Sequence, residues 1–133
     1  MIYQDFFEVE TKAGISLRDI TRGVVGSVKE SGVRNGICNV FLTSTTAGLL
    51  INENEIMLLE DIKKFYRPFA DDNRIYQHPS NAASHLRANL LAKDISIPVK
   101  DGNPVLGEWQ NILLAEFDKV ARKRKIFITI IGE

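Results

Sequence analysis

Two runs dominate the C-terminal part of the chain: Trp109-Gln110-Asn111-Ile112-Leu113-Leu114-Ala115-Glu116-Phe117 and, after a short basic segment, Lys125-Ile126-Phe127-Ile128-Thr129-Ile130-Ile131. The first run is long enough for a full strand whose successive side chains point to opposite faces. The second run is rich in β-branched residues, which favour strands. No helical pattern separates the two runs, and parallel strands would need a crossover connection. These runs therefore predict antiparallel pairing.

Four stretches nearer the N-terminus also predict strands, at residues 2–10, 36–43, 48–51 and 95–99. Residues 36–43 are apolar almost without a break, which is typical of a strand buried on both faces. Residues 95–99 contain Pro98, which has no N–H to donate, and this favours an edge strand. Asp101-Gly102 follows as a hairpin turn signal.

Three segments predict helices. Asp19 or Thr21 could cap a first helix that ends at Gly32. Apolar residues recur at helical spacing through residues 55–69, and a third helix follows Ser80-Asn81. The fold class predicted for residues 1–133 is therefore a single α+β domain, a mostly antiparallel β-sandwich with about three helices.

Composition narrows the classes of partner. Lys plus Arg and Asp plus Glu each number 17, so no global field favours nucleic acid or an anionic membrane. No apolar run is long enough to span a bilayer, and residues 1–5 do not resemble a signal peptide. The single cysteine, Cys38, allows no internal disulfide and is expected to be buried. We expect a cytoplasmic protein that binds neither nucleic acid nor membrane.

The two histidines of the chain fall within twelve residues, at His78 and His85. Pro79 cannot lie inside a helix, so His78 precedes the third helix and His85 lies within its first turns. Asn81, His85 and Asn89 then form a polar stripe between two apolar arcs. This pattern predicts a helix that is packed on both sides and turns its polar stripe into a shared cleft.

Five motifs in one order resemble the YjbQ-like family, over nearly the whole chain. They are Thr45-Thr46-Ala47 with Ile51-Asn52-Glu53-Asn54, Tyr76-x-His78, Asn81-Ala82-x-x-His85-Leu86, Ile97-Pro98-Val99 with Gly102, and Leu106-Gly107-x-Trp109-Gln110. The resemblance implies an antiparallel α+β sandwich that assembles as a homotrimer, with a polar cleft near the subunit boundaries. It also implies, for some members, a secondary thiamine-phosphate synthase activity. Ser44 stands where the family usually has a histidine, and the loop before the third helix is shortened.

The expected catalytic residues are His78, His85 and Glu53, with the two histidines as an acid/base pair. The residues expected to place a phosphorylated substrate carry hydroxyl, amide or guanidinium groups: Thr45, Thr46, Asn52, Asn81, Gln110 and Arg124. A second role for His78 and His85 is to bind a divalent metal such as zinc. Such a metal site would need a third ligand, from Asp61 or Glu53.

Three functions remain open at this point. The first is a small-molecule site, with thiamine-phosphate synthesis from phosphorylated precursors as the activity that the resemblance suggests. The second is a non-catalytic trimeric binding or scaffold protein, which Ser44 in place of histidine favours. The third is a metal-dependent hydrolase. Each histidine and hydroxyl also has a purely structural interpretation, because histidines often bond backbone carbonyls and threonines form strands well.

Overall fold

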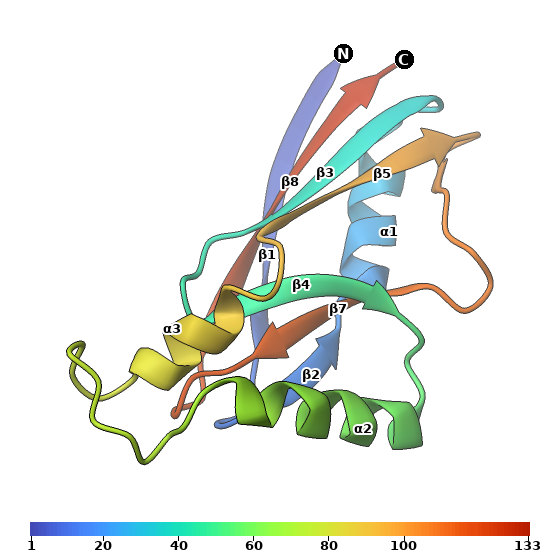
Figure 1. The fold of residues 1–133 in the computed structure, drawn as a ribbon. Helices are drawn as coiled ribbons and strands as arrows, with labels where there is room; N and C mark the ends of the chain where they lie inside the picture. The colour runs from blue at the N-terminus through green and yellow to red at the C-terminus, as the bar shows by residue number, and fades with distance from the viewer.

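The computed structural model describes residues 1–133, which form two antiparallel sheets and three α-helices (Figure 1). The large sheet has the order β1-β8-β3-β5-β6, and the small sheet has the order β2-β7-β4. The strands of the large sheet are β1 Ile2–Glu10, β8 Lys123–Gly132, β3 Gly36–Leu42, β5 Asp94–Lys100 and β6 Asn103–Pro104. The small sheet contains β2 Ser16–Asp19, β7 Asn111–Glu116 and β4 Ala47–Asn52. The predicted α+β class is confirmed.

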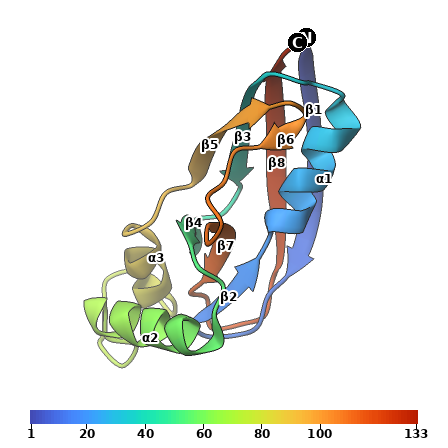
Figure 2. The same ribbon diagram turned by 90° about the vertical axis from the view of Figure 1, so that its right-hand side faces the viewer.

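The main core lies between the large sheet, the small sheet and helix α1, Thr21–Ser31 (Figure 2). Gly32 ends α1 in the left-handed conformation, as expected for a glycine stop. Valines of α1 meet alternate residues of β3 and β8, which all point to the same face of the large sheet. Cys38 belongs to this core, and burial raises the pKa of its thiol to about 11.

The small sheet is covered on its other side by α2, Ile56–Tyr66, and α3, Ala82–Ala88 (Figure 1). Strand β7 therefore buries both faces. Ile112 and Leu114 enter the main core, whereas Ala115 joins a second cluster with Phe117 and Ala88. The Glu55 carboxylate caps α2 by accepting from the Leu58 N–H at 2.6 Å. None of the helices is long and apolar enough to cross a membrane.

Some sequence-based expectations on the strands and on the second helix need correction. Strand β3 is buried on one face only, because nothing covers the outer face of the large sheet, and Ile37 is 55% exposed. The second helix stops at Tyr66 and continues as a 3-10 turn, η1, over Arg67–Phe69, where Pro68 removes an N–H donor. The strand expected from Trp109 begins two residues later, at Asn111.

The third helix is also arranged differently from the expectation. Its buried residues include Ala83, Ser84, Arg87 and Ala88, whereas Leu86 and Asn89 are exposed. The prediction that this helix packs with a polar stripe between two apolar arcs is therefore wrong. Arg87 lies outside the expected stripe, and its buried guanidinium donates to the Ala70 carbonyl and to the Asp72 carboxylate, each at 2.8 Å.

Candidate functional site

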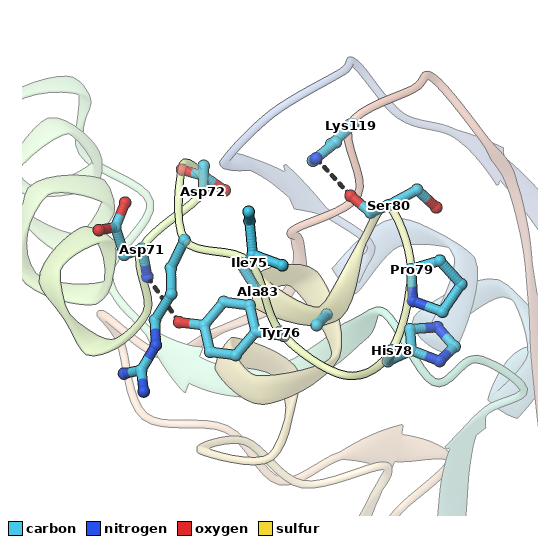
Figure 3. A pocket seen from close by; sticks show the side chains of 11 residues that line it. Asp71, Asp72, Ile75, Tyr76, His78, Pro79, Ser80, Ala83 and Lys119 are labelled. Carbon is cyan, nitrogen blue, oxygen red and sulfur yellow. Dashed lines mark hydrogen bonds between the residues drawn. The ribbon is translucent and has the colours of Figure 1, made fainter.

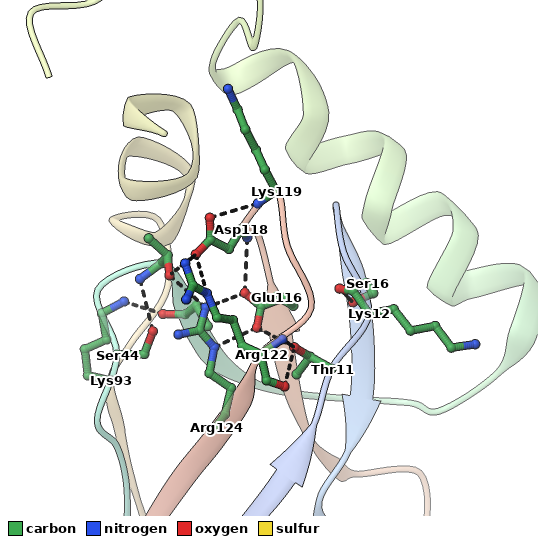
Figure 4. Close-up of polar contacts among 12 residues, drawn as sticks. Thr11, Lys12, Ser16, Ser44, Lys93, Glu116, Asp118, Lys119, Arg122 and Arg124 are labelled. Atoms are coloured by element: carbon green, nitrogen blue, oxygen red, sulfur yellow. Dashed lines mark hydrogen bonds and ion pairs between the residues drawn. The ribbon is translucent and has the colours of Figure 1, made fainter. Parts of the chain in front are cut away.

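A buried ion pair lies where the two sheets meet (Figure 4). Glu116 ends β7 in the small sheet, and Arg124 is the second residue of β8 in the large sheet. Arg124 donates through Nε to Oε2 of Glu116 at 2.7 Å and through Nη2 to Oε1. The carboxylate is fully buried and the guanidinium is 11% exposed. A bidentate pair of this kind fixes the plane of the guanidinium.

Two threonines complete the hydrogen bonding of the pair. The Thr46 hydroxyl accepts from Arg124 Nη2 at 2.7 Å, and the Thr11 hydroxyl donates to Glu116 Oε2 at 2.9 Å. The remaining nitrogen of Arg124, Nη1, donates to no acceptor within the chain. Because Arg124 also lines an open pocket, this nitrogen is the one left for a ligand.

A second acidic and basic pair lies beside the first. Arg122 donates through Nε to Asp118 at 2.9 Å, and the Lys119 backbone N–H donates to the other carboxylate oxygen at 2.8 Å. Burial opposes ionisation of Asp118, but these donors and the charge of Arg122 outweigh it, so the pKa of Asp118 lies below its ordinary value. Asn81 adds to this effect, which places its side chain next to Asp118.

An open pocket of about 450 Å³ lies over the connection between β3 and β4. Its polar lining residues are Thr43, Ser44, Thr45, Lys93 and Arg124. The Lys93 amine donates to the carbonyl oxygen of Ala47 and forms no ion pair with a carboxylate. Burial, followed by the nearby charge of Arg124, lowers the pKa of Lys93. The pocket thus combines two cationic side chains with three hydroxyl residues.

The two histidines meet edge to face, with ring centroids 4.9 Å apart. His78 is exposed, and its Nε2 lies 3.2 Å from the Asn81 Oδ1, whereas His85 is half-buried on α3. A smaller hollow of about 250 Å³ opens between the His78 loop and Lys119 (Figure 3). Asn81 therefore lies between the histidine pair and Asp118, which joins the two parts of the candidate site.

The two histidines are not accompanied by a metal-binding set. No group of three histidine, cysteine, aspartate or glutamate side chains is arranged to hold a metal ion. A zinc site needs at least three protein donors, and the alternative ligand Asp61 is exposed on α2. The donors within one chain therefore do not fit a zinc ion.

The comparisons with known proteins assign the family. The family model described as UPF0047 protein YjbQ-like matches residues 5–133. The chain belongs to the YjbQ-like UPF0047 family. A UPF0047 protein of Methanothermobacter thermautotrophicus is 39% identical to this YjbQ-like chain, over 99% of the chain and 94% of the relative. The UPF0047 protein YugU of Bacillus subtilis is 28% identical, over 94% of the chain and 96% of the relative.

Solved structures agree with this YjbQ-like assignment. A YbjQ-like protein of unknown function from Sulfolobus solfataricus P2 superimposes with a TM-score of 0.89 at 36% identity, and each chain is covered completely. A hypothetical protein from Aeropyrum pernix K1 gives a TM-score of 0.92 at 32% identity, over 98% of this chain and 99% of the other. The resemblance inferred from the five motifs is confirmed.

The predicted site residues of the YjbQ-like chain fall into two groups. Thr45, Thr46 and Arg124 lie at the pocket end of the sheets, and Asn81 connects this end to the histidines. Asn52, Glu53 and Gln110 lie at the opposite end of the small sheet, because Asn52 pairs with Asn111 there whereas Ala47 pairs with Glu116. A single chain does not bring Glu53 to the histidines.

The second group makes local bonds in this chain. The Asn52 Oδ1 accepts from the Glu53 N–H at 2.8 Å, and the Gln110 Oε1 accepts from the Gly107 N–H at 2.7 Å. These are turn contacts that leave the Glu53 carboxylate without a hydrogen bond from the chain. The roles given to Asn52, Glu53 and Gln110 stay predictions.

Sequence reasoning missed Glu116, Asp118 and Lys93 as parts of the site. Glu116 did carry a signal, because a carboxylate within the apolar run of residues 112–117 must be buried with a cationic partner. Lys93 carried none: it stands in a mixed segment after α3, and only the fold places it beside Arg124.

Proposed function

We propose that this YjbQ-like protein binds a small phosphorylated molecule in the pocket formed by Ser44, Thr45, Lys93 and Arg124. The observation that carries the proposal is the pairing of the Arg124 guanidinium, fixed by Glu116, with a Lys93 amine that has no carboxylate partner. A guanidinium and an ammonium side by side suit the oxygens of a phosphate group.

The balance of charge around the pocket supports an anionic ligand. Glu116 compensates Arg124 and Asp118 compensates Arg122, so both carboxylates are already engaged. The Lys93 amine bonds only a backbone carbonyl oxygen, that of Ala47. The positive charge of Lys93 therefore remains without an anionic partner in the pocket, and a phosphate monoester carries a negative charge at neutral pH.

The histidine pair would supply acid/base chemistry to the bound molecule. His78 is accessible to solvent, and its ring contacts Asn81, whose side chain also helps to lower the pKa of Asp118. Imidazole exchanges protons near neutral pH, which suits a general acid or base. In this proposal the pocket holds the phosphate, and His78 with His85 moves a proton at the reacting end of the ligand.

A secondary thiamine-phosphate synthase activity is the specific form of this proposal that the family resemblance suggests. Its substrates would be phosphorylated thiamine precursors, whose phosphate groups match the cationic pocket. The alternative is a non-catalytic binding or scaffold protein, which Ser44 favours because it stands in this pocket where the family usually has a histidine. Binding of a phosphorylated ligand without turnover would favour this alternative. A gain of turnover on Ser44→His would favour the enzyme.

Assembly into a homotrimer is also proposed, and the outer face of the large sheet supports self-association. A row of apolar side chains crosses four strands, Ile2 on β1, Ile131 on β8, Ile37 on β3 and Pro98 on β5. An aromatic row of Phe6, Phe127 and Phe41 runs parallel to it. Exposed apolar faces of this kind mark interaction sites, and in a three-fold ring this face would pack against a different face of the next copy.

A homotrimer would also give the second group of predicted residues a role. Within one chain, Asn52 and Glu53 lie at the opposite end of the small sheet from the pocket. In an assembly, this end of one copy would complete the histidine site of the next, as expected for a cleft near a subunit boundary. A cytoplasmic location, without nucleic-acid or membrane partners, remains part of the proposal.

Calorimetric titration tests the binding proposal. Inorganic phosphate and phosphorylated thiamine precursors would be titrated into the wild-type protein and into Lys93→Met and Lys123→Met. Lys123 is exposed, so its variant removes one charge outside the pocket. We expect Lys93→Met to raise the Kd by about tenfold or more, the size of one charge-assisted hydrogen bond, and Lys123→Met to change it little. Equal effects of both variants would refute the proposed pocket.

A further inference from the structure

Lys93 is held in place at both ends of its side chain. Its backbone carbonyl accepts from the Leu42 N–H at 2.7 Å, which ties the residue to the end of β3. The preceding residue, Ala92, forms a bridge with Leu49 of β4. At the other end, the amine donates to the Ala47 carbonyl. The side chain therefore spans from one sheet to the other and is not a mobile surface lysine.

The surroundings of this amine differ from those of a lysine in an ion pair. It lines the pocket with Arg124, and no carboxylate neutralises it. The residue is half-buried, and burial together with Arg124 lowers its pKa. A lysine beside a second cation and shielded from water keeps more of its amine in the neutral form, which is the nucleophilic form.

We propose that Lys93 is a nucleophile that forms an imine with a phosphorylated aldehyde or ketone held in this pocket. This inference rests on the proposed function, because Arg124 and the hydroxyls of Ser44 and Thr45 would hold the phosphate group. The pocket volume of about 450 Å³ leaves room for a small ligand beside the amine.

The step balances in atoms and charge. The neutral amine of Lys93 attacks the carbonyl carbon and forms a carbinolamine. The carbinolamine then loses its hydroxyl as water, and the carbon–nitrogen double bond forms. The ammonium form plus the carbonyl compound thus gives a protonated imine plus water, with one positive charge on each side. Because the protonated imine keeps the charge of Lys93, the phosphate group keeps its compensation by two cations.

Reductive trapping tests the inference with pyridoxal 5′-phosphate as the probe, since it carries an aldehyde and a phosphate monoester. The full chain would be incubated with limiting probe, reduced with borohydride, digested and mapped by mass spectrometry. We expect the reduced adduct on Lys93 at a yield at least about tenfold above that of other lysines, because a neutral amine near a phosphate site reacts first. Excess inorganic phosphate should suppress this adduct selectively.

Two variants separate the imine from phosphate binding. Lys93→Arg keeps the positive charge but cannot form an imine, so it should still bind inorganic phosphate and lose the adduct at this position. Lys119→Arg is the matched control, because Lys119 bonds the Ser80 carbonyl at the neighbouring hollow, and it should keep the Lys93 adduct.

The outcomes distinguish the two proposals. Phosphate binding that depends on Lys93, with no preferred adduct on Lys93, overturns the imine and leaves the proposed function intact. No phosphate binding in the wild-type protein, together with labelling spread evenly over the lysines, overturns both. Because the adduct is mapped on the wild-type chain, a variant that fails to fold does not affect the test of the imine.

Discussion

The carboxylate of Glu116 on β7 is fully buried and holds the guanidinium of Arg124 on β8 through both of its oxygens. These strands belong to different sheets, so the pair joins the small sheet to the large one at the pocket. Thr46, directly before β4, bonds Arg124, and Thr11, directly after β1, bonds Glu116. One buried contact therefore stabilises the sandwich and aims the guanidinium that the proposed ligand needs.

Glu116→Gln should destabilise the fold strongly. It leaves a buried guanidinium without its counter-charge, and breaking a buried pair from one side costs about 3–5 kcal/mol in the free energy of unfolding. Urea denaturation of the variant measures this loss. Glu108→Gln, at an exposed position, is the control and should change the free energy by less than about 0.5 kcal/mol. Equal stability of the two variants would show that the pair does not join the sheets.

Asp72→Asn should loosen the loop between η1 and α3. Arg87 is buried and donates to both oxygens of Asp72, so the variant removes the only carboxylate that compensates it. We expect the free energy of unfolding to fall by about 1–3 kcal/mol, the cost of a buried group left partly unsatisfied. Faster limited proteolysis within residues 70–80 would accompany it. Asp71→Asn is the control, because Asp71 only caps the Asn73 N–H.

The ion pair between Asp72 and Arg87 predicts that the stability of the protein depends on pH in the acid range. Hydrogen bonding from Arg87 holds the pKa of Asp72 below its ordinary value of 3.8, despite some opposing desolvation. A carboxyl with a depressed folded-state pKa stabilises the protein above that ordinary value and loses this effect as the pH falls through the folded-state pKa. The Tm difference between wild type and Asp72→Asn should therefore be full at about pH 6 and shrink below about pH 4. A difference that stays constant down to about pH 2 would contradict this linkage.

His78→Ala should affect function and not stability. The side chain is exposed, and its ring contacts only Asn81 and His85. Thermal unfolding should shift by less than the equivalent of about 0.5 kcal/mol. Turnover of the proposed phosphorylated substrate should fall by about 10²–10⁴-fold, the usual contribution of a general acid or base. Full turnover in the variant would remove His78 from the mechanism.

A pair of glycine variants tests the packing of the large sheet. A Cβ on Gly36 would lie 2.0 Å from the Ile131 carbonyl oxygen, and backbone atoms cannot yield easily. Gly36→Ala should therefore cost at least about 1–3 kcal/mol. Gly26 lies on an exposed part of α1, and a Cβ added there would meet open space, so Gly26→Ala should stabilise the protein by about 0.5–1 kcal/mol. Chemical denaturation of both variants measures whether the free energy of unfolding falls or rises.

Ile37→Lys should disrupt the proposed homotrimer. Ile37 lies at the centre of the exposed apolar row on the large sheet, between Ile131 and Pro98. A charge there would be buried without a partner in an assembly that uses this face. Sedimentation should show a lower mass than for wild type. Lys29→Glu is the control, because Lys29 is exposed on α1, which packs on the inner face of the large sheet. An unchanged mass for Ile37→Lys would exclude this face as the interface.

Much of the fold follows from local patterns. Strand β1 matches residues 2–10 as predicted, and α1 stops at Gly32 as predicted, although its N-cap is Ile20 and neither Asp19 nor Thr21. The alternation in β7 correctly separates the residues that face the two cores. Strand β2 was missed, because Ser16–Asp19 is short and mostly polar and pairs only with β7. Its presence depends on a partner strand almost a hundred residues away.

The candidate site was predicted only in part, for the same reason. Thr45, Thr46 and Arg124 carry hydroxyl and guanidinium groups that identify them as phosphate-binding candidates, and the fold does place them together. Lys93 joins them because β5 pairs with β3, and this brings the segment after α3 back to the pocket. Asn52 and Glu53 share a motif with Thr46, yet an extended β4 carries them to the far end of the small sheet.

Periodicity, caps and turn residues act over a few positions, so the sequence was enough to establish the α+β class, most strands, and the stop of α1. Family membership likewise follows from motifs that keep their order along the chain. Which charges meet was decided only by tertiary structure. Glu116 and Arg124 are buried together because two sheets close over them, and Lys93 lies near Arg124 through long-range strand pairing. Burial and electrostatic coupling depend on distances in space, which no local pattern contains.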